Sequence, residues 1–144
     1  MTEIKKTGWV AGTILRDASG DWDSLKAVEK IPFGSLVEYV SEFHCQVATA
    51  ATKQVHGIAL VPKCPRKLCG EDYKYAYKEG ENVDIALHRG VIALKIEEDP
   101  KEWEKDKPLY VKAGKITATK EGEEFARFQE ILDEKSKIVS VWKV

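Results

Sequence analysis

Residues 83–96, VDIALHRGVIALKI, decide the fold class of this chain. In residues 83–87 and again in residues 92–96, a branched apolar side chain stands at every second position. Alternation with a period of two is typical of a β-strand that buries one face. Between the two runs, His88-Arg89-Gly90 indicates a turn. The stretch therefore predicts two consecutive strands that share one buried face.

The same period of two recurs before and after this stretch. Pro32 and Pro62 stand at the margins of the runs before it, where a strand tolerates a missing amide donor. After it, Gly114-Lys115 separates two short alternating runs and predicts a hairpin. The C-terminal run is rich in β-branched residues and predicts a closing strand. The further predicted strands are residues 35–40, 58–61, 109–113, 116–118 and 137–144.

Residues 123–135, EEFARFQEILDEK, fit two interpretations. Phe125, Phe128 and Leu132 recur with the spacing of one helical face, flanked by charged residues. The turn-like residues 133–136 and the strand after them equally suit a hairpin whose first arm covers about residues 126–131. Periodicity alone leaves helix and strand both open.

Short strands separated by frequent turns predict an all-β fold. Roughly six to nine strands with at most one short helix are typical of an antiparallel β-sandwich or barrel, of which the jelly roll is one form. The chain has 144 residues, which suits a single hydrophobic core better than two. We expect an N-terminal arm over residues 1–12 and a single β domain over residues 13–144.

The composition of the chain disfavours some classes of function. Lys plus Arg number 23 and Asp plus Glu number 24, so no global positive charge favours a nucleic-acid partner. The sequence has neither a signal peptide nor a membrane-spanning apolar run, which predicts synthesis in a cytoplasm without membrane attachment. Lysine outnumbers arginine 19 to 4 and glutamate outnumbers aspartate 16 to 8, a skew typical of heat-adapted, thermostable proteins.

The residues that commonly carry chemistry do not form a catalytic pattern. His44, His56 and His88 are scattered, and no nucleophile motif accompanies them. Cys64 and Cys69, with Cys45 beside His44, would supply four ligands for a zinc ion, but the usual paired spacing is missing. The cysteines would otherwise form a local Cys64–Cys69 disulfide or stay as three free thiols. We expect no enzyme, no cofactor and no metal site.

Several motifs follow one another in an order that resembles a known family. Their collinear order is informative, although each alone is weak. The order resembles the structural cement, or decoration, proteins of tailed bacteriophages over roughly residues 8–144. The motifs are Ile31-Pro32-Phe33-Gly34, His56-Gly57-Ile58-Ala59, the entry from Tyr77 to Ile85, the run from Arg89 to Ile96, and Pro108-Leu109-Tyr110-Val111.

The chain departs from the family pattern at two places. Residues 63–75, KCPRKLCGEDYKY, carry paired cysteines that the pattern lacks and predict a specialised loop. Residues 105–108, KDKP, stand where the family has Gly-Asp before its Val-Tyr step. The resemblance favours strand, turn and strand for residues 123–144 over a helix.

The resemblance implies a non-enzymatic protein that binds the outer surface of a phage head and stabilises contacts between major capsid protein subunits. It further implies a homo-oligomer, dimer or trimer, located on the virion after synthesis in the host cytoplasm. No membrane or nucleic-acid partner is expected. The second hypothesis is a non-viral β-sandwich or barrel module that binds an oligonucleotide, a sugar or a protein, with a Cys-ligated metal as an optional addition.

Five aromatic residues are the candidates for an interface. Tyr73, Tyr75 and Tyr77 are spaced by two, so a strand would place their rings on one face, where they would anchor a partner or border the protein's own core. Trp9 and Trp22 flank a polar stretch near the N-terminus, as part of an arm or as caps on an open end of the sandwich.

Two clusters of charge are the second clue to an interface. Opposite charges on two surfaces would suit contacts between copies, and solvated loops are the plainer interpretation. The basic residues are Lys63, Arg66, Lys67, Lys74 and Lys78, and the acidic residues are Glu97, Glu98, Asp99, Glu102 and Glu104.

Overall fold

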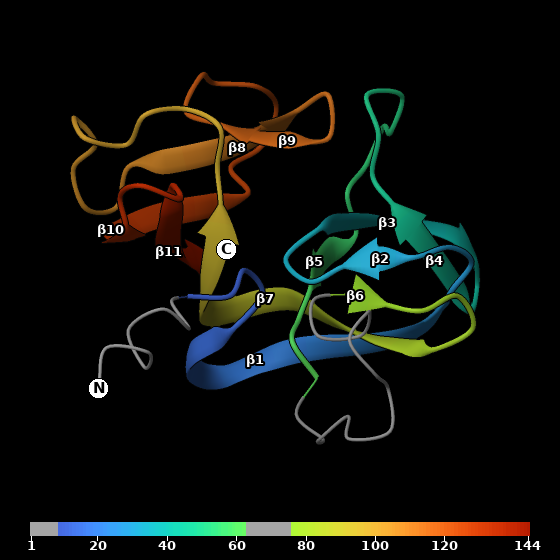
Figure 1. Ribbon diagram of the computed structural model, residues 1–144. Helices are drawn as coiled ribbons and strands as arrows, with labels where there is room; N and C mark the ends of the chain where they lie inside the picture. Colours follow the sequence, from blue (N-terminus) through green and yellow to red (C-terminus); the bar gives the residue numbers. More distant parts are fainter. Residues whose placement is uncertain (1–8, 63–75) are drawn as a thin grey trace, which may run out of the picture.

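The computed structural model describes residues 9–62 and 76–144, and within them it contains eleven strands and no helix (Figure 1). The all-β prediction is confirmed. The described residues also contain no helix that could cross a membrane. The strands are β1 (Ile14–Ala27), β2 (Ile31–Pro32), β3 (Leu36–Ser41), β4 (His44–Val47), β5 (Gly57–Ala59), β6 (Ala76–Tyr77), β7 (Asn82–Lys95), β8 (Pro108–Lys112), β9 (Lys115–Thr117), β10 (Ala126–Asp133) and β11 (Ile138–Lys143).

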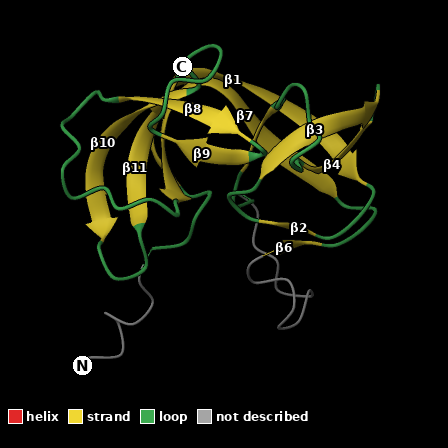
Figure 2. Ribbon diagram, turned by 90° about the horizontal axis from the view of Figure 1, so that it is seen from above, coloured by secondary structure: helices red, strands yellow, loops and turns green. Residues whose placement is uncertain are grey.

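The main sheet closes on itself at one end. Its order is β1-β4-β3-β5-β7-β11-β10-β8-β9, and β1 also pairs with β7, so β1, β4, β3, β5 and β7 form a closed ring. We call this ring the barrel. The remaining strands, β11, β10, β8 and β9, continue from β7 as the C-terminal sheet. Figure 2 shows the two halves side by side, with β1 and β7 running across both. All pairings are antiparallel except the short one between β1 and β4.

Each half has its own hydrophobic core, and strands of the barrel separate the two. Neighbouring residues of a strand point to opposite faces, so Ala59 of β5 lies in the barrel core while Ile58 lies in the C-terminal core. Val37 and Leu36 of β3 divide in the same way. Because both of its faces are covered, β5 is buried at every residue, as its uninterrupted apolar sequence predicts.

Residues 83–96 form one bent strand instead of the predicted pair of strands. Arg89 adopts a positive φ of 58°, yet β7 stays paired with β1 on both sides of it. Asp17 pairs with Gly90 and Asp21 pairs with His88. Between these two pairs, β1 therefore has more residues than β7. Such a β-bulge bends a strand without reversing it. The residues that indicated a turn therefore mark a bend, through which β7 serves both halves (Figure 1).

The C-terminal part follows the prediction closely. Residues 126–133 form strand β10, which confirms the strand interpretation of residues 123–135 over the helix. The hairpin of β8 and β9 turns at Ala113 and Gly114, both with positive φ, one residue before the predicted turn. Strand β11 pairs with β10 on one side and β7 on the other, so the predicted closing strand joins the C-terminal sheet to the barrel.

Two glycines allow close approaches that hold the architecture together. A Cβ on Gly57 would lie 2.3 Å from the carbonyl oxygen of Ala86, so only glycine lets β5 pack against β7 here. A Cβ on Gly114 would lie 2.9 Å from the carbonyl oxygen of Thr49. The β8–β9 turn thus rests directly on the chain after β4, which makes a further contact between the two halves.

Candidate functional site

Of the predicted tyrosine row, Tyr77 belongs to the barrel core. It is 2% exposed, its ring meets Phe33 edge to face with centroids 5.2 Å apart, and its hydroxyl donates to the carbonyl oxygen of Leu60. Strand β6 pairs with β2 and closes one end of the barrel. The prediction of Tyr77 as a surface anchor is therefore wrong, because its ring fills this end. Tyr73 and Tyr75 lie outside the described residues.

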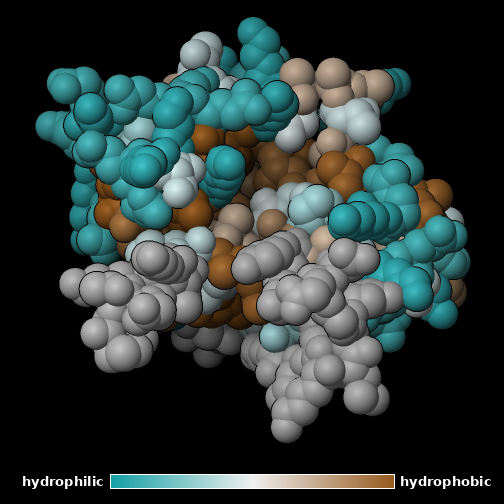
Figure 3. All heavy atoms as spheres, viewed as in Figure 1, coloured by the Kyte–Doolittle hydropathy of each residue, from teal (hydrophilic) through white to brown (hydrophobic). Residues whose placement is uncertain are grey.

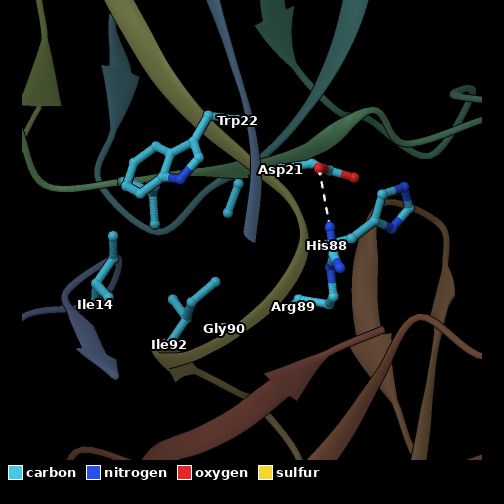
Figure 4. A pocket seen from close by; sticks show the side chains of 9 residues that line it. Ile14, Asp21, Trp22, His88, Arg89, Gly90 and Ile92 are labelled. Atoms are coloured by element: carbon cyan, nitrogen blue, oxygen red, sulfur yellow. Dashed lines mark hydrogen bonds and ion pairs between the residues drawn. The ribbon is translucent and has the colours of Figure 1, made fainter. Parts of the chain in front are cut away.

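The two tryptophans differ in exposure. Trp9 is 42% exposed, whereas Trp22 is partly buried and packs against the C-terminal core. Figure 4 shows the Trp22 indole facing a small pocket together with Ile14 and Ile92, with the Asp21–Arg89 ion pair (3.2 Å) beside it. The polar stretch between the two tryptophans lies within β1, so Trp22 supports the bend of β1 and β7 and is not part of an arm.

The acidic cluster makes contacts within the molecule. Glu97 pairs with Lys115 at 2.8 Å, which lowers the pKa of Glu97. The carboxylate of Glu98 accepts hydrogen bonds from the Thr117 hydroxyl (2.7 Å) and the Ala118 amide (3.1 Å). These contacts fasten residues 97–98 to strand β9. Of the basic cluster only Lys78 is described, so the suggested pairing of the two clusters stays a prediction.

The described residues offer no metal site. Within residues 9–62 and 76–144 no group of His, Cys, Asp and Glu side chains is arranged to hold an ion. Cys45 is fully buried in the barrel core, while the ring of His44 contacts the Ser41 hydroxyl at 2.8 Å on exposed surface. Adjacent residues on a strand point to opposite faces, so Cys45 and His44 do not form the suggested pair. Cys64 and Cys69 lie outside the described residues.

Among the described residues, the three large apolar side chains with the highest exposed fractions lie on the hairpin of β3 and β4. Phe43 is 67% exposed, Tyr39 53% and Val40 48%. We call these three residues the hairpin patch. Scattered exposed apolar residues are ordinary on a protein surface, but three on one short hairpin mark a candidate interaction site. Sequence patterns did not reveal the patch, because an apolar run that ends in a turn looks the same whether it is buried or exposed.

A polar cluster beside the hairpin patch covers the second end of the barrel. The His56 ring contacts the carboxylate of Asp23 at 2.7 Å, and the Tyr39 ring packs against His56 at a tilt of 40° with centroids 3.9 Å apart. The Tyr39 hydroxyl lies 3.4 Å from the same Asp23 carboxylate. Partial burial acts to raise the pKa of Asp23, but hydrogen bonds from His56 and the Ser24 amide outweigh it and lower that pKa. These contacts join β1, β3 and the segment before β5.

On the face drawn in Figure 3, the surface is hollowed between the two halves and hydrophobic residues line the floor of the hollow. A recess of about 270 Å³ between the halves is lined by apolar side chains of both, including Leu36 and Ala48 from the barrel half and Ile116 from the C-terminal sheet. A wider groove between the halves, of about 820 Å³, borders His56 and the end of β11. The described surface therefore offers grooves and an apolar patch suited to binding a partner.

Comparisons with known proteins identify the family of this chain. A chain from the structure "The capsid of Myoviridae Phage XM1" has the same fold, with a TM-score of 0.62 at 17% identity, covering 94% of this chain and 89% of that one. No curated protein sequence matches. The family model described as "Structural cement protein (E217 gp24/Pam3 gp6)" matches residues 5–141. This protein therefore belongs to the phage structural cement protein family.

Proposed function

We propose that this protein binds the outer surface of a phage head and stabilises contacts between major capsid protein subunits. The observation that carries the proposal is the family match over residues 5–141, which includes nearly all of both halves. The likeness to a chain of the phage XM1 capsid structure supports the same role through the fold. Membership of a structural protein family implies that the role is not enzymatic.

The hairpin patch is the part of the surface that we assign to capsid contact. Interfaces are enriched in aromatic residues at their centre, where a few side chains carry most of the binding energy. Phe43 is the most exposed large apolar side chain among those described. Tyr39 is held by His56 and Asp23, so less side-chain freedom is lost when a partner binds. Trp9, at 42% exposed, is a second contact candidate.

A cement protein acts through many copies, so each contact needs only modest strength. Identical sites recur over a symmetric shell, and linked binding events raise the overall avidity far above that of a single contact. We propose that the protein acts on the virion as a dimer or trimer, made in the host cytoplasm. Self-association would multiply the hairpin patches that reach the shell at one time.

The test is co-sedimentation of the purified protein with phage heads that lack it, followed by electron microscopy of the pellet. Saturable binding with density on the outer surface is the expected result. Protein that stays in the supernatant over a range of salt and temperature would refute the capsid role.

Variants then test the assignment of the surface. Phe43→Ala should weaken binding by about tenfold or more, the loss typical of an interface hot spot. Glu42→Ala, at the neighbouring exposed position, is the matched control and should leave binding within about twofold. Equal binding by the wild type and Phe43→Ala would place the capsid contact elsewhere, and Trp9→Ala would then test the second candidate.

A further inference from the structure

The C-terminal sheet and β7 form a ring of strands that is one strand short of closure. Each pairing in the order β7-β11-β10-β8-β9 is antiparallel, so β9 runs in the same direction as β7. Within the described residues β9 pairs only with β8, and it does not pair with β7. An antiparallel ring needs an even number of strands, because neighbouring strands alternate in direction. One added strand would therefore close the gap between β9 and β7 with antiparallel pairing on both of its sides.

The open edge of β9 presents the backbone of Ile116. The amide of Ala118 lies on this edge, because it donates to the Glu98 carboxylate at 3.1 Å and not to β8. Residues two apart in a strand direct their backbone groups to the same side. The N–H and C=O of Ile116 therefore also point away from β8, and no hydrogen bond among the described residues uses either group.

The edge of β7 that faces away from β11 presents the backbone of Lys95 in the same way. Ala93 uses this edge to pair with the chain before β1, since its carbonyl accepts from the Gly12 amide at 2.7 Å and its amide donates to the Thr13 carbonyl at 3.0 Å. Lys95, two residues further on, directs its N–H and C=O to the same side, past the end of that pairing. In the part of the chain that the structure describes, neither group has a hydrogen-bond partner.

Both open edges line the recess of about 270 Å³ between the two halves. Figure 2 shows β9 on the side of the C-terminal sheet that faces the barrel. The apolar residues that line the recess include Leu36, Ala48, Leu94, Ile96 and Ile116, all of which belong to or pack on the C-terminal core. Its volume lies below the range of about 300–1,000 Å³ that is usual for small-molecule pockets. The recess therefore suits apolar side chains of an extended chain better than a small ligand.

We propose that an extended segment of a shell subunit enters this recess as an added strand between β7 and β9. The inference rests on the proposed capsid function and adds a second contact, distinct from the hairpin patch. The backbone of the segment would form hydrogen bonds with Ile116 on one side and with Lys95 on the other. Addition of a strand gives affinity through these main-chain bonds, and an apolar side chain that points into the recess gives specificity.

The two open edges also decide which kind of chain can bind. A strand paired on both sides must come from a tail or an arm, because the outermost strand of another sheet has only one open edge. Edge-to-edge pairing of two copies of this chain therefore does not fit the recess. Residues 1–8 of a second copy would bring Lys5 and Lys6 close to Lys95, and like charges oppose such binding. A segment of a shell subunit without basic residues meets no such repulsion.

The first test removes the backbone donor of β9. Ile116→Pro eliminates the amide N–H at an edge position, where a strand tolerates proline. Ile116→Val is the matched control, because it keeps the amide and also carries a smaller apolar side chain. Binding to phage heads that lack the protein should fall about tenfold in Ile116→Pro, the effect of losing one buried hydrogen bond, and stay within about twofold in Ile116→Val. Wild-type binding by Ile116→Pro, or equal loss in both variants, would overturn the proposal.

A second pair of variants keeps the test independent of how well Ile116→Pro folds. Ser35→Tyr fills the recess from the barrel side, whereas Ser136→Tyr places the same ring on the exposed turn between β10 and β11. Only Ser35→Tyr should weaken binding, by about tenfold or more, with a thermal unfolding midpoint close to that of the wild type. Unchanged binding by a folded Ser35→Tyr protein would mean that the recess stays empty on the phage head.

Photo-cross-linking then identifies the occupant. A diazirine-bearing lysine analogue at position 95, on the exposed rim of the recess, should cross-link to the shell protein on assembled heads, and mass spectrometry locates the segment. A cross-link to residues 1–8 of another copy would overturn the proposal. Wild-type protein that does not bind heads would overturn the proposed function together with this inference. Wild-type protein that binds heads as well as Ile116→Pro and Ser35→Tyr do would overturn this inference alone.

Discussion

The barrel and the C-terminal sheet both bury ionisable side chains, and two of these, Cys45 and Lys143, differ in charge. Cys45 lies in the barrel core, where burial, followed by the nearby Asp23 carboxylate, raises the pKa of its thiol to about 11. Lys143 lies at the edge of the C-terminal core, where burial lowers its pKa to about 8. At neutral pH the barrel therefore holds a neutral thiol, whereas the C-terminal sheet still holds a charged ammonium.

The difference follows from how each half is closed. The β2–β6 pair covers one end of the barrel, and Asp23, Tyr39 and His56 cover the other, so its core is sealed and neutral. The C-terminal core ends instead at the open groove, with Lys143 at the boundary. A sealed core stabilises the fold, while a core that ends at a groove can exchange water for a partner. We therefore assign structural support to the barrel interior.

The largest expected effect tests whether the two halves unfold separately. Phe128→Ala removes a ring that is 4% exposed and packs edge to face on Trp103, and it should lower the free energy of unfolding by about 3–5 kcal/mol. Because β7 belongs to both halves, urea unfolding should stay a single transition, with coincident circular dichroism and tryptophan fluorescence curves.

The barrel variant Ile85→Ala is the counterpart, since Ile85 is fully buried in the other core. It should cost about 2–5 kcal/mol and give one transition as well. Two separated transitions in either variant would mean that one half folds without the other.

The second prediction concerns Lys143 and alkaline pH. Its pKa is about 8 in the folded protein, below the ordinary value of 10.5, so the folded state loses this proton first as the pH rises. The stability contributed by this residue should therefore increase between pH 8 and 10.5, by on the order of 3 kcal/mol in total. Urea unfolding at a series of pH values should show the increase in the wild type but not in Lys143→Met. Parallel pH profiles for the two proteins would show that Lys143 is not desolvated.

Cys45 should have the opposite effect on how the free energy of unfolding changes with pH. Its folded pKa of about 11 lies above the ordinary value of 9.0, so the unfolded chain ionises first. The thiol's contribution is fully present below pH 9 and is lost as the pH rises toward 11, by about 2–3 kcal/mol. The difference in unfolding free energy between the wild type and Cys45→Ala should shrink across that window. A constant difference would indicate that the barrel end admits water to Cys45.

The smallest effect concerns the polar cover of the barrel. Asp23→Asn removes the carboxylate that contacts His56 at 2.7 Å, and it should cost about 1 kcal/mol at neutral pH because the pair is partly exposed. The pKa of Asp23 is lowered in the folded protein, so its contribution is present above about pH 4 and is lost as the pH falls through the folded pKa. Unfolding curves of the two proteins should converge at acidic pH. A difference that persists there would point to packing as its cause.

Much of the fold was predictable from local patterns. Strands that alternate and end at clear turns, such as residues 108–112 and 138–143, lie where the sequence predicts them. Strand β1 was missed because its polar stretch has no alternation, and long pairing with β7 stabilises it instead. The turn predicted at His88-Arg89-Gly90 was wrong because the same residues suit a bulge, and only the pairing with β1 distinguishes the two.

The candidate site was less predictable, because exposure depends on the tertiary fold. Tyr77 and Tyr39 both lie on short strands, yet one is buried and the other exposed. Lys143 carried a usable signal: Val139, Val141 and Lys143 share one face of the closing strand, so the alternation places a lysine in line with core residues. A charged residue at an apolar position of a predicted strand is thus a candidate for a buried charge.

Strand β7 also bears on how the molecule would respond to a pulling force. Its residues bind β1 and β5 on the barrel side and β11 on the other, so both halves are attached to one continuous backbone. A pull applied between the barrel and the C-terminal sheet would be transmitted along this strand, which is hydrogen-bonded to β1, β5 and β11. In the capsid role proposed above, such a molecule would act as a stiff tie and not as a hinge.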